Sequence, residues 1–175
     1  MRKELILKTL IAYYSRPYQN YSLGSIINLK RGNTLRLAEL IAKRTGGELF
    51  EIKQLHPYSR CYNECIDQAC KDLKNKARPE LAAYLDSLDG YDEVYLGFPN
   101  YWGDAPMAVY TFLERLNLSG KSIHVFVTHE GSGLGRSLDN LIKAFPEAKF
   151  APGLAVHGSH VDEAVPELEK WLKGE

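Results

Sequence analysis

Short apolar segments alternate with amphipathic segments along the chain, and this alternation limits the possible folds more than any other feature. The apolar segments are rich in β-branched and aromatic residues, which is typical of buried strands. A strand followed by a helix and then by another strand favours a parallel sheet with right-handed helical crossovers. The predicted strands are residues 9–14, 48–52, 93–98, 122–128 and 149–156.

The amphipathic segments have apolar residues at helical spacing and predict five helices. The residues that define them are Leu37, Ala38 and Ile41; Tyr62, Ile66, Ala69 and Leu73; Val109, Phe112, Leu113 and Leu116; Leu134, Leu138, Leu141, Ile142 and Phe145; and Val165, Leu168 and Leu172. Helices on both faces of a parallel sheet make a three-layer α/β sandwich. Since 175 residues, 45% of them apolar, form one sizeable core, we predict a single domain over residues 1–175.

Charge and hydropathy argue against several classes of partner. The 22 basic residues balance 22 acidic residues, so no net field favours nucleic acid or an anionic membrane surface. No segment has the roughly 20 apolar residues of a membrane span, and no small-residue cleavage site follows the first apolar run. We therefore expect a cytoplasmic protein.

Three cysteines, an odd number, do not predict a disulfide framework. Cys61, Cys65 and Cys70 belong to one predicted helical segment, in which Cys65 and Cys70 fall on opposite edges of the apolar stripe. Thiols placed in this way do not converge on one metal ion. We expect reduced cysteines and no metal site.

Candidate binding residues follow the first, third and fourth predicted strands, and in parallel α/β sheets ligands bind beyond the carboxyl ends of the strands. The first loop ends in Gly32-Asn33-Thr34 at a predicted helix start, where free backbone N–H groups favour an anion. The structural alternative is that Asn33 or Thr34 only caps the helix. Residues 16–31 are predicted to be an irregular excursion.

Aromatic residues follow the third predicted strand, in the sequence PNYWGDAP. Tyr101 and Trp102 are flanked by Pro99, Asn100 and Gly103, which indicate an exposed loop. An exposed ring beside a glycine suits stacking on a flat heterocycle that the bare backbone can approach. Burial of the rings in the core is the structural alternative.

Three glycines follow the fourth predicted strand, in the sequence HEGSGLG. Gly131, Gly133 and Gly135 permit close approach of the backbone to a ligand, whereas a simple turn would need only one of them. The segment is not the nucleophile elbow of a hydrolase, because Glu130 and Leu134 stand where that motif needs glycine.

Together, YYS…GNT, NYWGDAP and THEGSGLG resemble the flavodoxin-like family. The resemblance extends from the first strand to the last helix, and it implies a five-stranded parallel sheet of order 2-1-3-4-5 that binds FMN. It also implies a phosphate site, a loop against the flavin ring with Gly103 at flavin N5, and a contact along the ring edge. The residues implied are, in that order, Ser15, Asn33 and Thr34; Pro99, Asn100, Tyr101, Trp102 and Gly103; and His129, Glu130, Gly131 and Gly133.

The sequence departs from the family pattern in two places. Residues 16–31 separate Ser15 from Gly32 and bring Arg16 near the phosphate site, where it either neutralises the phosphate or is solvated at the surface. The loop after the fourth strand has no aromatic residue to cover the outer face of the ring. That face is then open, or it is covered by Tyr18, Tyr21 or a partner subunit.

The resemblance implies an FMN-dependent oxidoreductase that passes electrons from NAD(P)H or a protein donor to a small acceptor. The flavin supplies the redox chemistry, so no catalytic side chain is assigned, and His129 is the one candidate proton donor. Two alternatives stay open, a pure electron carrier and a binding module that has lost the flavin. Homodimers are common among flavin reductases of this fold, so a second copy of the chain is a further expected partner.

Overall fold

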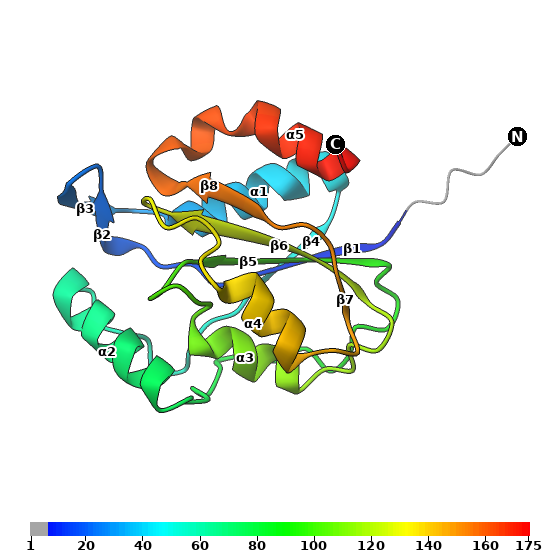
Figure 1. Cartoon of the computed structure of the whole chain (residues 1–175), viewed down its shortest axis with the longest axis horizontal. Coiled ribbons are helices and arrows are strands. Elements are labelled where there is room, and N and C mark those ends of the chain that lie inside the picture. The colour runs from blue at the N-terminus through cyan, green and yellow to red at the C-terminus, as the bar shows by residue number, and fades with distance from the viewer. Residues whose placement is uncertain (1–6) are drawn as a thin grey trace, which may run out of the picture.

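The computed structural model describes residues 7–175 and shows a parallel sheet between two layers of helices (Figure 1). The strands of the main sheet are β1 (Thr9–Tyr13), β4 (Glu48–Glu51), β5 (Glu93–Pro99), β6 (Ser122–His129), β7 (Lys149–Phe150) and β8 (Leu154–His157). The helices are α1 (Asn33–Thr45), α2 (Tyr62–Lys74), α3 (Met107–Glu114), α4 (Ser137–Ala144) and α5 (Val165–Lys173), with a 3-10 helix η1 (Gly158–Glu163). A hairpin of β2 (Tyr18–Ser22) and β3 (Ser25–Leu29) forms a separate small sheet.

The main sheet has the strand order β4-β1-β5-β6, with β7 and β8 both paired to β6, and all of these pairings are parallel. This arrangement confirms the predicted order 2-1-3-4-5. The predicted fifth strand, residues 149–156, is divided into β7 and β8. Pro152 lies between them and has no backbone N–H to donate to the ladder, which gives a physical reason for the break.

The central strands are buried on both faces because alternate side chains pack into two apolar clusters. In β1, Leu10 and Ala12 belong to a cluster with residues of α3 and α4, whereas Ile11 and Tyr13 belong to a cluster with residues of α1 and α5. Figure 1 shows these two helix pairs on opposite sides of the sheet. The alternation accounts for the nearly continuous apolar character of the strand sequences.

The excursion 16–31 contains regular structure that the sequence did not predict. Its β2-β3 hairpin closes through Leu23 and Gly24, whose φ angles of 48° and 87° are those of a two-residue type I′ turn. Tyr, Asn and Gln break the expected alternation of polar and apolar residues, so no strand pattern was visible. The hairpin lies at the end of the sheet where β5 and β6 terminate, next to α2 (Figure 1).

Helix α4 also differs from its prediction, because it begins at Ser137 and leaves Leu134 in the preceding loop. The carbonyl of Leu134 accepts hydrogen bonds from the backbone N–H of Ser137 (3.2 Å) and from its hydroxyl (2.6 Å). This local turn lets Leu134 pack on the core without being helical. In the part of the chain from residue 7 onward, no helix combines the length and the apolar content of a membrane span.

Gly97, in the centre of β5, leaves space that the Phe126 ring of β6 fills. A Cβ atom at Gly97 would lie deep inside van der Waals contact with that ring, and Phe126 is fully buried. We expect Gly97→Ala to lower the free energy of unfolding by about 1–3 kcal/mol, because Phe126 must shift in a closely packed core. Urea denaturation measures this loss.

The double variant Gly97→Ala/Phe126→Leu provides the control. Leucine lacks the outer ring atoms that a Cβ at Gly97 would meet, so the two substitutions together should cost less than the sum of the single ones. Strictly additive losses would contradict the proposed overlap.

Candidate functional site

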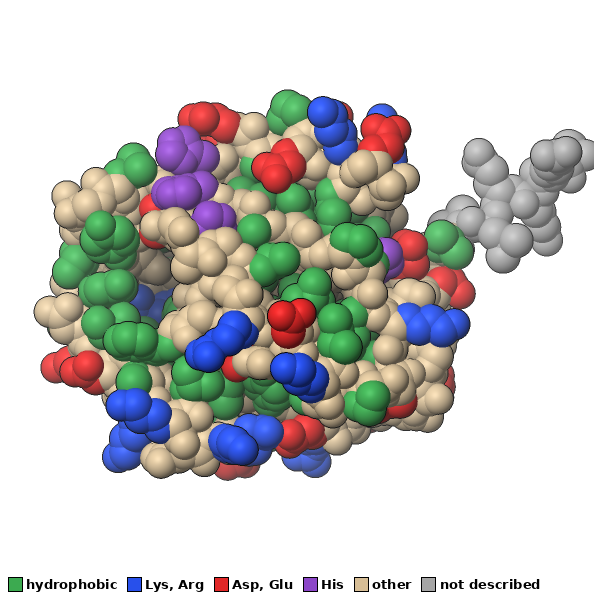
Figure 2. Space-filling view, viewed as in Figure 1, with side chains coloured by type: hydrophobic (Ala, Val, Ile, Leu, Met, Phe, Trp, Pro, Cys, Tyr) green, Lys and Arg blue, Asp and Glu red, His purple; other side chains and the backbone are tan. Residues whose placement is uncertain are grey.

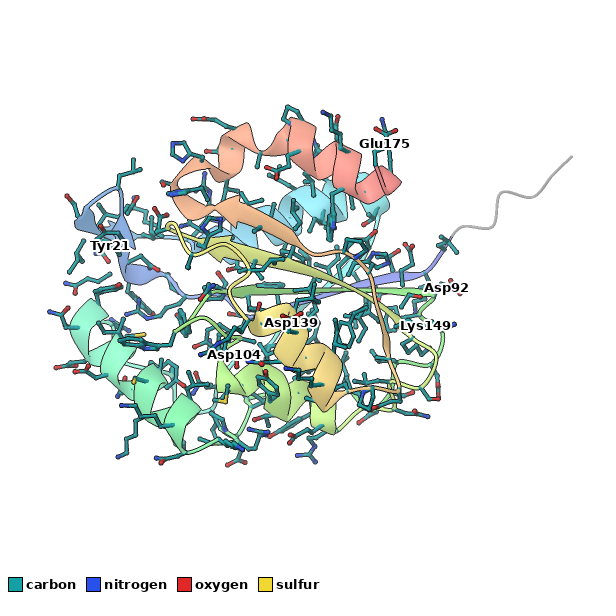
Figure 3. All side chains as sticks on the ribbon, in the orientation of Figure 1. Tyr21, Asp92, Asp104, Asp139, Lys149 and Glu175 are labelled. Atoms are coloured by element: carbon teal, nitrogen blue, oxygen red, sulfur yellow. The ribbon has the colours of Figure 1, made fainter. Side chains whose placement is uncertain are left out.

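One cavity of about 350 Å³ opens at the carboxyl end of the sheet, where the loops after β1, β5 and β6 meet. This volume falls within the range of small-molecule and cofactor sites. Figure 3 labels Tyr21 on the hairpin beside this end of the sheet. The lining residues are Arg16, Tyr21, Asn33, Tyr62, Cys65, Ile66, Ala69, Pro99, Asn100, Tyr101, Trp102, Thr128, His129, Glu130, Ser132 and Gly158.

Arg16 brings a buried positive charge to the wall of this cavity. Only 9% of the residue is exposed, and its terminal nitrogens donate to the backbone carbonyls of Gln19, Ser59 (2.7 Å) and Arg60 (2.9 Å). Its buried Nε atom has no hydrogen-bond partner, and no carboxylate among residues 7–175 forms an ion pair with it. A buried cation without a counter-charge is costly, so an anion in the cavity would compensate Arg16.

The N-terminus of α1 is capped by the side chain of Ser15, which lies outside the helix, rather than by a side chain of the helix itself. Gly32 is the N-cap residue and has no side-chain cap, and the hydroxyl oxygen of Ser15 accepts a hydrogen bond from the N–H of Leu35 (3.0 Å). A Cβ atom at Gly32 would collide with this hydroxyl and with the Arg16 backbone, so the position requires glycine. The alternative in which Asn33 or Thr34 caps the helix is wrong.

The loop after β5 holds Trp102 in a tight turn. Tyr101 and Asp104 exchange two backbone hydrogen bonds, and Trp102 and Gly103 have φ angles of 57° and 81°. Trp102 is 51% exposed, and its indole N–H donates to the carbonyl of Ile66 in α2 (2.8 Å). The unfavourable left-handed conformation of a tryptophan is thus accompanied by a contact that fixes the ring at the cavity wall.

Asp104 ties this turn to the helices below the sheet (Figure 3). Its carboxylate accepts hydrogen bonds from the hydroxyl of Tyr110 (2.9 Å) in α3 and from the side-chain amide of Asn140 (2.7 Å) in α4. Burial, followed by the charge of Asp104, raises the pKa of Tyr110, so this phenol stays protonated and remains a donor. The carboxylate has enough partners to be stable in its buried position.

Asn100 joins the loops after β5 and β6. Its side-chain oxygen accepts from the N–H of Gly103 (2.8 Å), and its amide nitrogen donates to the carbonyl of Gly133 (2.9 Å). The carbonyl of Gly103 in turn accepts from the N–H of Arg136 (2.7 Å). Both backbone groups of Gly103 are therefore hydrogen-bonded within the protein, the N–H to Asn100 and the carbonyl to Arg136.

Helix α2 supplies one wall of the cavity through Tyr62, Cys65, Ile66 and Ala69. Burial raises the pKa of Cys65, and burial raises the pKa of Tyr101 well above its usual value. Both groups are therefore neutral at physiological pH and form an apolar wall. The sequence placed these residues on one helical stripe but did not associate the stripe with the binding loops, because their contact is made only in the folded chain.

The opposite wall carries His129 and Glu130. The Nδ1 atom of His129 accepts from the N–H of Gly131 (2.9 Å), so the neutral ring carries its proton on Nε2. Burial, and then the nearby charge of His157, lower the pKa of His129 and favour this neutral form. The carboxylate of Glu130 accepts from the N–H (2.8 Å) and the hydroxyl (3.0 Å) of Ser159, which attaches the loop to η1.

The comparisons with known proteins agree with this arrangement. Residues 27–174 match the sequence profile of the family described as Flavodoxin. The chain belongs to the flavodoxin family. No curated protein matches the sequence of this flavodoxin.

Solved structures share the fold of this flavodoxin over nearly its whole length. A candidate flavoprotein from Bacteroides uniformis ATCC 8492 is 26% identical, with a TM-score of 0.74 over 94% of this chain and 99% of that one. A second from Bacteroides eggerthii DSM 20697 is 25% identical, with a TM-score of 0.71 over 93% and 98%. A flavoprotein from Lactobacillus acidophilus NCFM, solved in complex with FMN, is 24% identical, with a TM-score of 0.67 over 90% and 97%.

The flavodoxin fold gathers most, but not all, of the site residues that the sequence suggested. Those that line the cavity are Arg16, Asn33, Pro99, Asn100, Tyr101, Trp102, His129 and Glu130. Those that do not are Ser15, Thr34, Gly103, Gly131 and Gly133. The hydroxyl of Ser15 accepts a hydrogen bond at the N-terminus of α1, and the hydroxyl of Thr34 is hydrogen-bonded to that of Thr128 (2.7 Å). The phosphate contact expected of these two hydroxyls and the flavin contact expected of Gly103 stay predictions.

Asn100→Asp tests whether the side chain of Asn100 holds the two loops of this flavodoxin together. The variant keeps the acceptor for Gly103 but directs an oxygen at the carbonyl of Gly133. We expect the free energy of unfolding at pH 7 to fall by about 1–3 kcal/mol in urea denaturation, since a hydrogen bond is replaced by repulsion.

Asn117→Asp is the matched control for the Asn100 variant. The exposed Asn117 uses only its side-chain oxygen, which accepts from the N–H of Ser119 (3.1 Å), so aspartate preserves its contact. Its effect should stay below about 0.5 kcal/mol. Equal losses at the two positions would show that Asn100 has no special role.

Proposed function

We propose that this flavodoxin binds FMN in the cavity and acts as an oxidoreductase that passes electrons from NAD(P)H or a protein donor to a small acceptor. The observation that carries the proposal is Arg16, a buried cation that has no carboxylate partner among residues 7–175, on the wall of a cavity that tyrosine and tryptophan side chains also line. This combination suits a ligand with a phosphate at one end and a flat ring system at the other.

The lining divides into a polar part and an aromatic part. Arg16 and Asn33 would hold the phosphate, because they provide a guanidinium and a side-chain amide next to the start of α1. Tyr62 and Trp102 would contact the flavin ring. Membership of the flavodoxin family supports FMN as the ligand, and the Lactobacillus acidophilus structure shows FMN bound to a protein of the same fold.

FMN, when bound, supplies the redox chemistry, and the residues of the chain position it and control its surroundings. Cys65 and Tyr101 keep their protons, since burial raises both pKa values, and they exclude water from one wall. His129 is the neutral group on the other wall and holds a proton on Nε2. Below its lowered pKa it becomes charged, so acidification adds positive charge beside the cavity.

The balance of charge favours a small acceptor over a dedicated protein acceptor. Electron carriers that dock on oppositely charged partners gain speed from a strong net field, whereas this chain has 22 residues of each sign. Tyr21 and Trp102, 42% and 51% exposed, offer aromatic surface at the cavity where a planar molecule can stack. A pure electron carrier is the second candidate function, because the fold alone suits it equally.

The functional unit is proposed to be one domain over residues 1–175. It is proposed to work in the cytoplasm and to pair with a second copy of the chain. Two apolar clusters on opposite faces of one sheet support the assignment of a single domain.

Titration of the purified protein with FMN and with riboflavin tests the binding site. Arg16→Ala should weaken FMN binding about 10- to 100-fold, because a charge-assisted contact worth roughly 1.5–3 kcal/mol is lost, and quenching of flavin fluorescence measures it. Arg16→Lys should weaken it less, since the charge remains.

Riboflavin, which lacks the phosphate, is the matched probe for the Arg16 variants. Its affinity should be nearly the same for the natural protein and for both variants. A parallel loss of riboflavin binding would assign Arg16 a structural role. Failure of the natural protein to bind either flavin would instead favour the flavin-free binding module.

Steady-state oxidation of NADH and NADPH separates the reductase from the electron carrier. With FMN bound and a quinone as acceptor, the reductase should turn over without any second protein. Oxidation that requires an added flavodoxin reductase would contradict direct use of the nucleotide and would favour the electron carrier. The absorbance of the nucleotide at fixed quinone concentration provides the measurement.

A further inference from the structure

The β2-β3 hairpin has one covered edge and one bare edge. On the outer side of β2, the N–H of Gln19 donates to the carbonyl of Arg60 (3.3 Å). On the outer side of β3, no other segment of residues 7–175 forms a backbone hydrogen bond. All but the last residue of β3 are exposed, so this edge is open to another strand.

The register of the hairpin identifies the free groups on this edge. Because Gln19 donates outward to Arg60, Gln19 and its opposite residue Asn28 do not exchange hydrogen bonds with each other. Pairs alternate along an antiparallel ladder, so the same holds for Tyr21 and Ile26. The N–H and C=O groups of Ile26 and Asn28 therefore point away from the hairpin.

The hairpin also exposes a large apolar surface. Tyr18, Tyr21, Leu23, Ile26 and Ile27 are 37–69% exposed, which amounts to on the order of 500 Å² of side-chain surface. Leu23 is the most exposed of them and has a positive φ of 48°, an unfavourable conformation for leucine. Figure 2 shows hydrophobic side chains gathered on the left of the molecule, where Figure 1 places the hairpin. A single two-stranded hairpin is only marginally stable in water, so a partner strand on the open edge would stabilise it further.

The chemistry of the hairpin identifies the partner as a second copy of the chain. Residues 17–29 contain no charged side chain, so nothing here complements a charged protein, and no lysine protects the open edge. An antiparallel pairing of one strand with its own copy is symmetric about a two-fold axis, which is the commonest symmetry of oligomers. The exposed side chains of Ile26 and Ile27 lie on the pairing strand itself, so edge pairing brings them next to their copies.

We propose that two copies of this chain associate through antiparallel pairing of β3 with the partner's β3, which joins the two hairpins into one four-stranded sheet. With the axis at Ile27, the outward groups of Ile26 meet those of the partner's Asn28, and the reverse pair forms symmetrically. This register uses all the free groups of the edge. Tyr21 belongs to the same hairpin and lines the cavity, so the pairing also braces one wall of the binding site.

Sedimentation velocity of the natural protein, without flavin, tests the association directly. We expect a species of about twice the 19.8 kDa mass of one chain. Ile27→Lys should weaken the dimer at least tenfold, because it places a charge on the two-fold axis. Leu49→Lys is the matched control at the edge of the main sheet, where Leu49 is 44% exposed on β4, and it should leave the dimer unchanged.

The outcomes that would overturn the pairing are distinct from those that concern the flavin. A natural protein that is monomeric at about 100 µM would contradict it, because even a weak dimer with a micromolar Kd is populated at that concentration. A dimer that Leu49→Lys disrupts and Ile27→Lys does not would place the interface at β4. Circular dichroism confirms that each variant is folded, and flavin affinity is measured separately.

Cross-linking tests the register. Ile27 and the partner's Ile27 would form a pair without mutual hydrogen bonds, with Cα atoms about 4.5 Å apart, which a disulfide can bridge. Ile27→Cys should therefore give a covalent dimer with oxidised glutathione on a non-reducing gel. Leu23→Cys, at the turn and away from the axis, should not, although Leu23 is the more exposed of the two residues. Equal cross-linking of both variants, or none at Ile27→Cys, would overturn the register.

Discussion

The parallel pairing of β1, β5 and β6 is the constraint on which the rest of the structure depends. Each crossover helix returns the chain to the same end of the sheet, so the loops that follow these three strands emerge side by side. Burial of both sheet faces fixes the strands, and the fixed strands place the loops within reach of one another. Asn100 then joins two of these loops by hydrogen bonds to Gly103 and Gly133.

Arg16 carries a buried charge that costs stability unless an anion lies beside it. Its guanidinium is held by carbonyl groups, which satisfy hydrogen bonds but do not neutralise its charge. Because the guanidinium is buried against the backbone of residues 59–60, water does not solvate it fully. This cost supports the proposal that the charge of Arg16 belongs to an anion site.

The sequence allowed accurate prediction of the main sheet and much poorer prediction of the β2-β3 hairpin and of the cavity wall that α2 forms. The apolar runs that became β1, β5 and β6 are buried on both faces, and such strands have a strong compositional pattern. The hairpin is stabilised by contacts with the segment around Arg60, and its turn places Leu23 at an unfavourable positive φ, so its own residues carry little pattern. For the same reason, the cavity wall formed by Tyr62 and Ile66 could not be predicted, since α2 reaches the loops only through tertiary packing.

The sequence by itself determined the α/β class, the strand order, the family resemblance and the three loops that meet at the cavity. Local composition and periodicity indicate the α/β class and the position of the loops, because hydrophobic burial and crossover handedness act in the same way on every chain of this type. The strand order was implied by the family resemblance that the loop motifs carry. Only the tertiary structure decided which groups in those loops are free. Ser15 and Gly103 are hydrogen-bonded to their neighbours, whereas Arg16 has no carboxylate partner in the part of the chain that the structure describes, because pairing depends on distances between segments that the sequence does not specify.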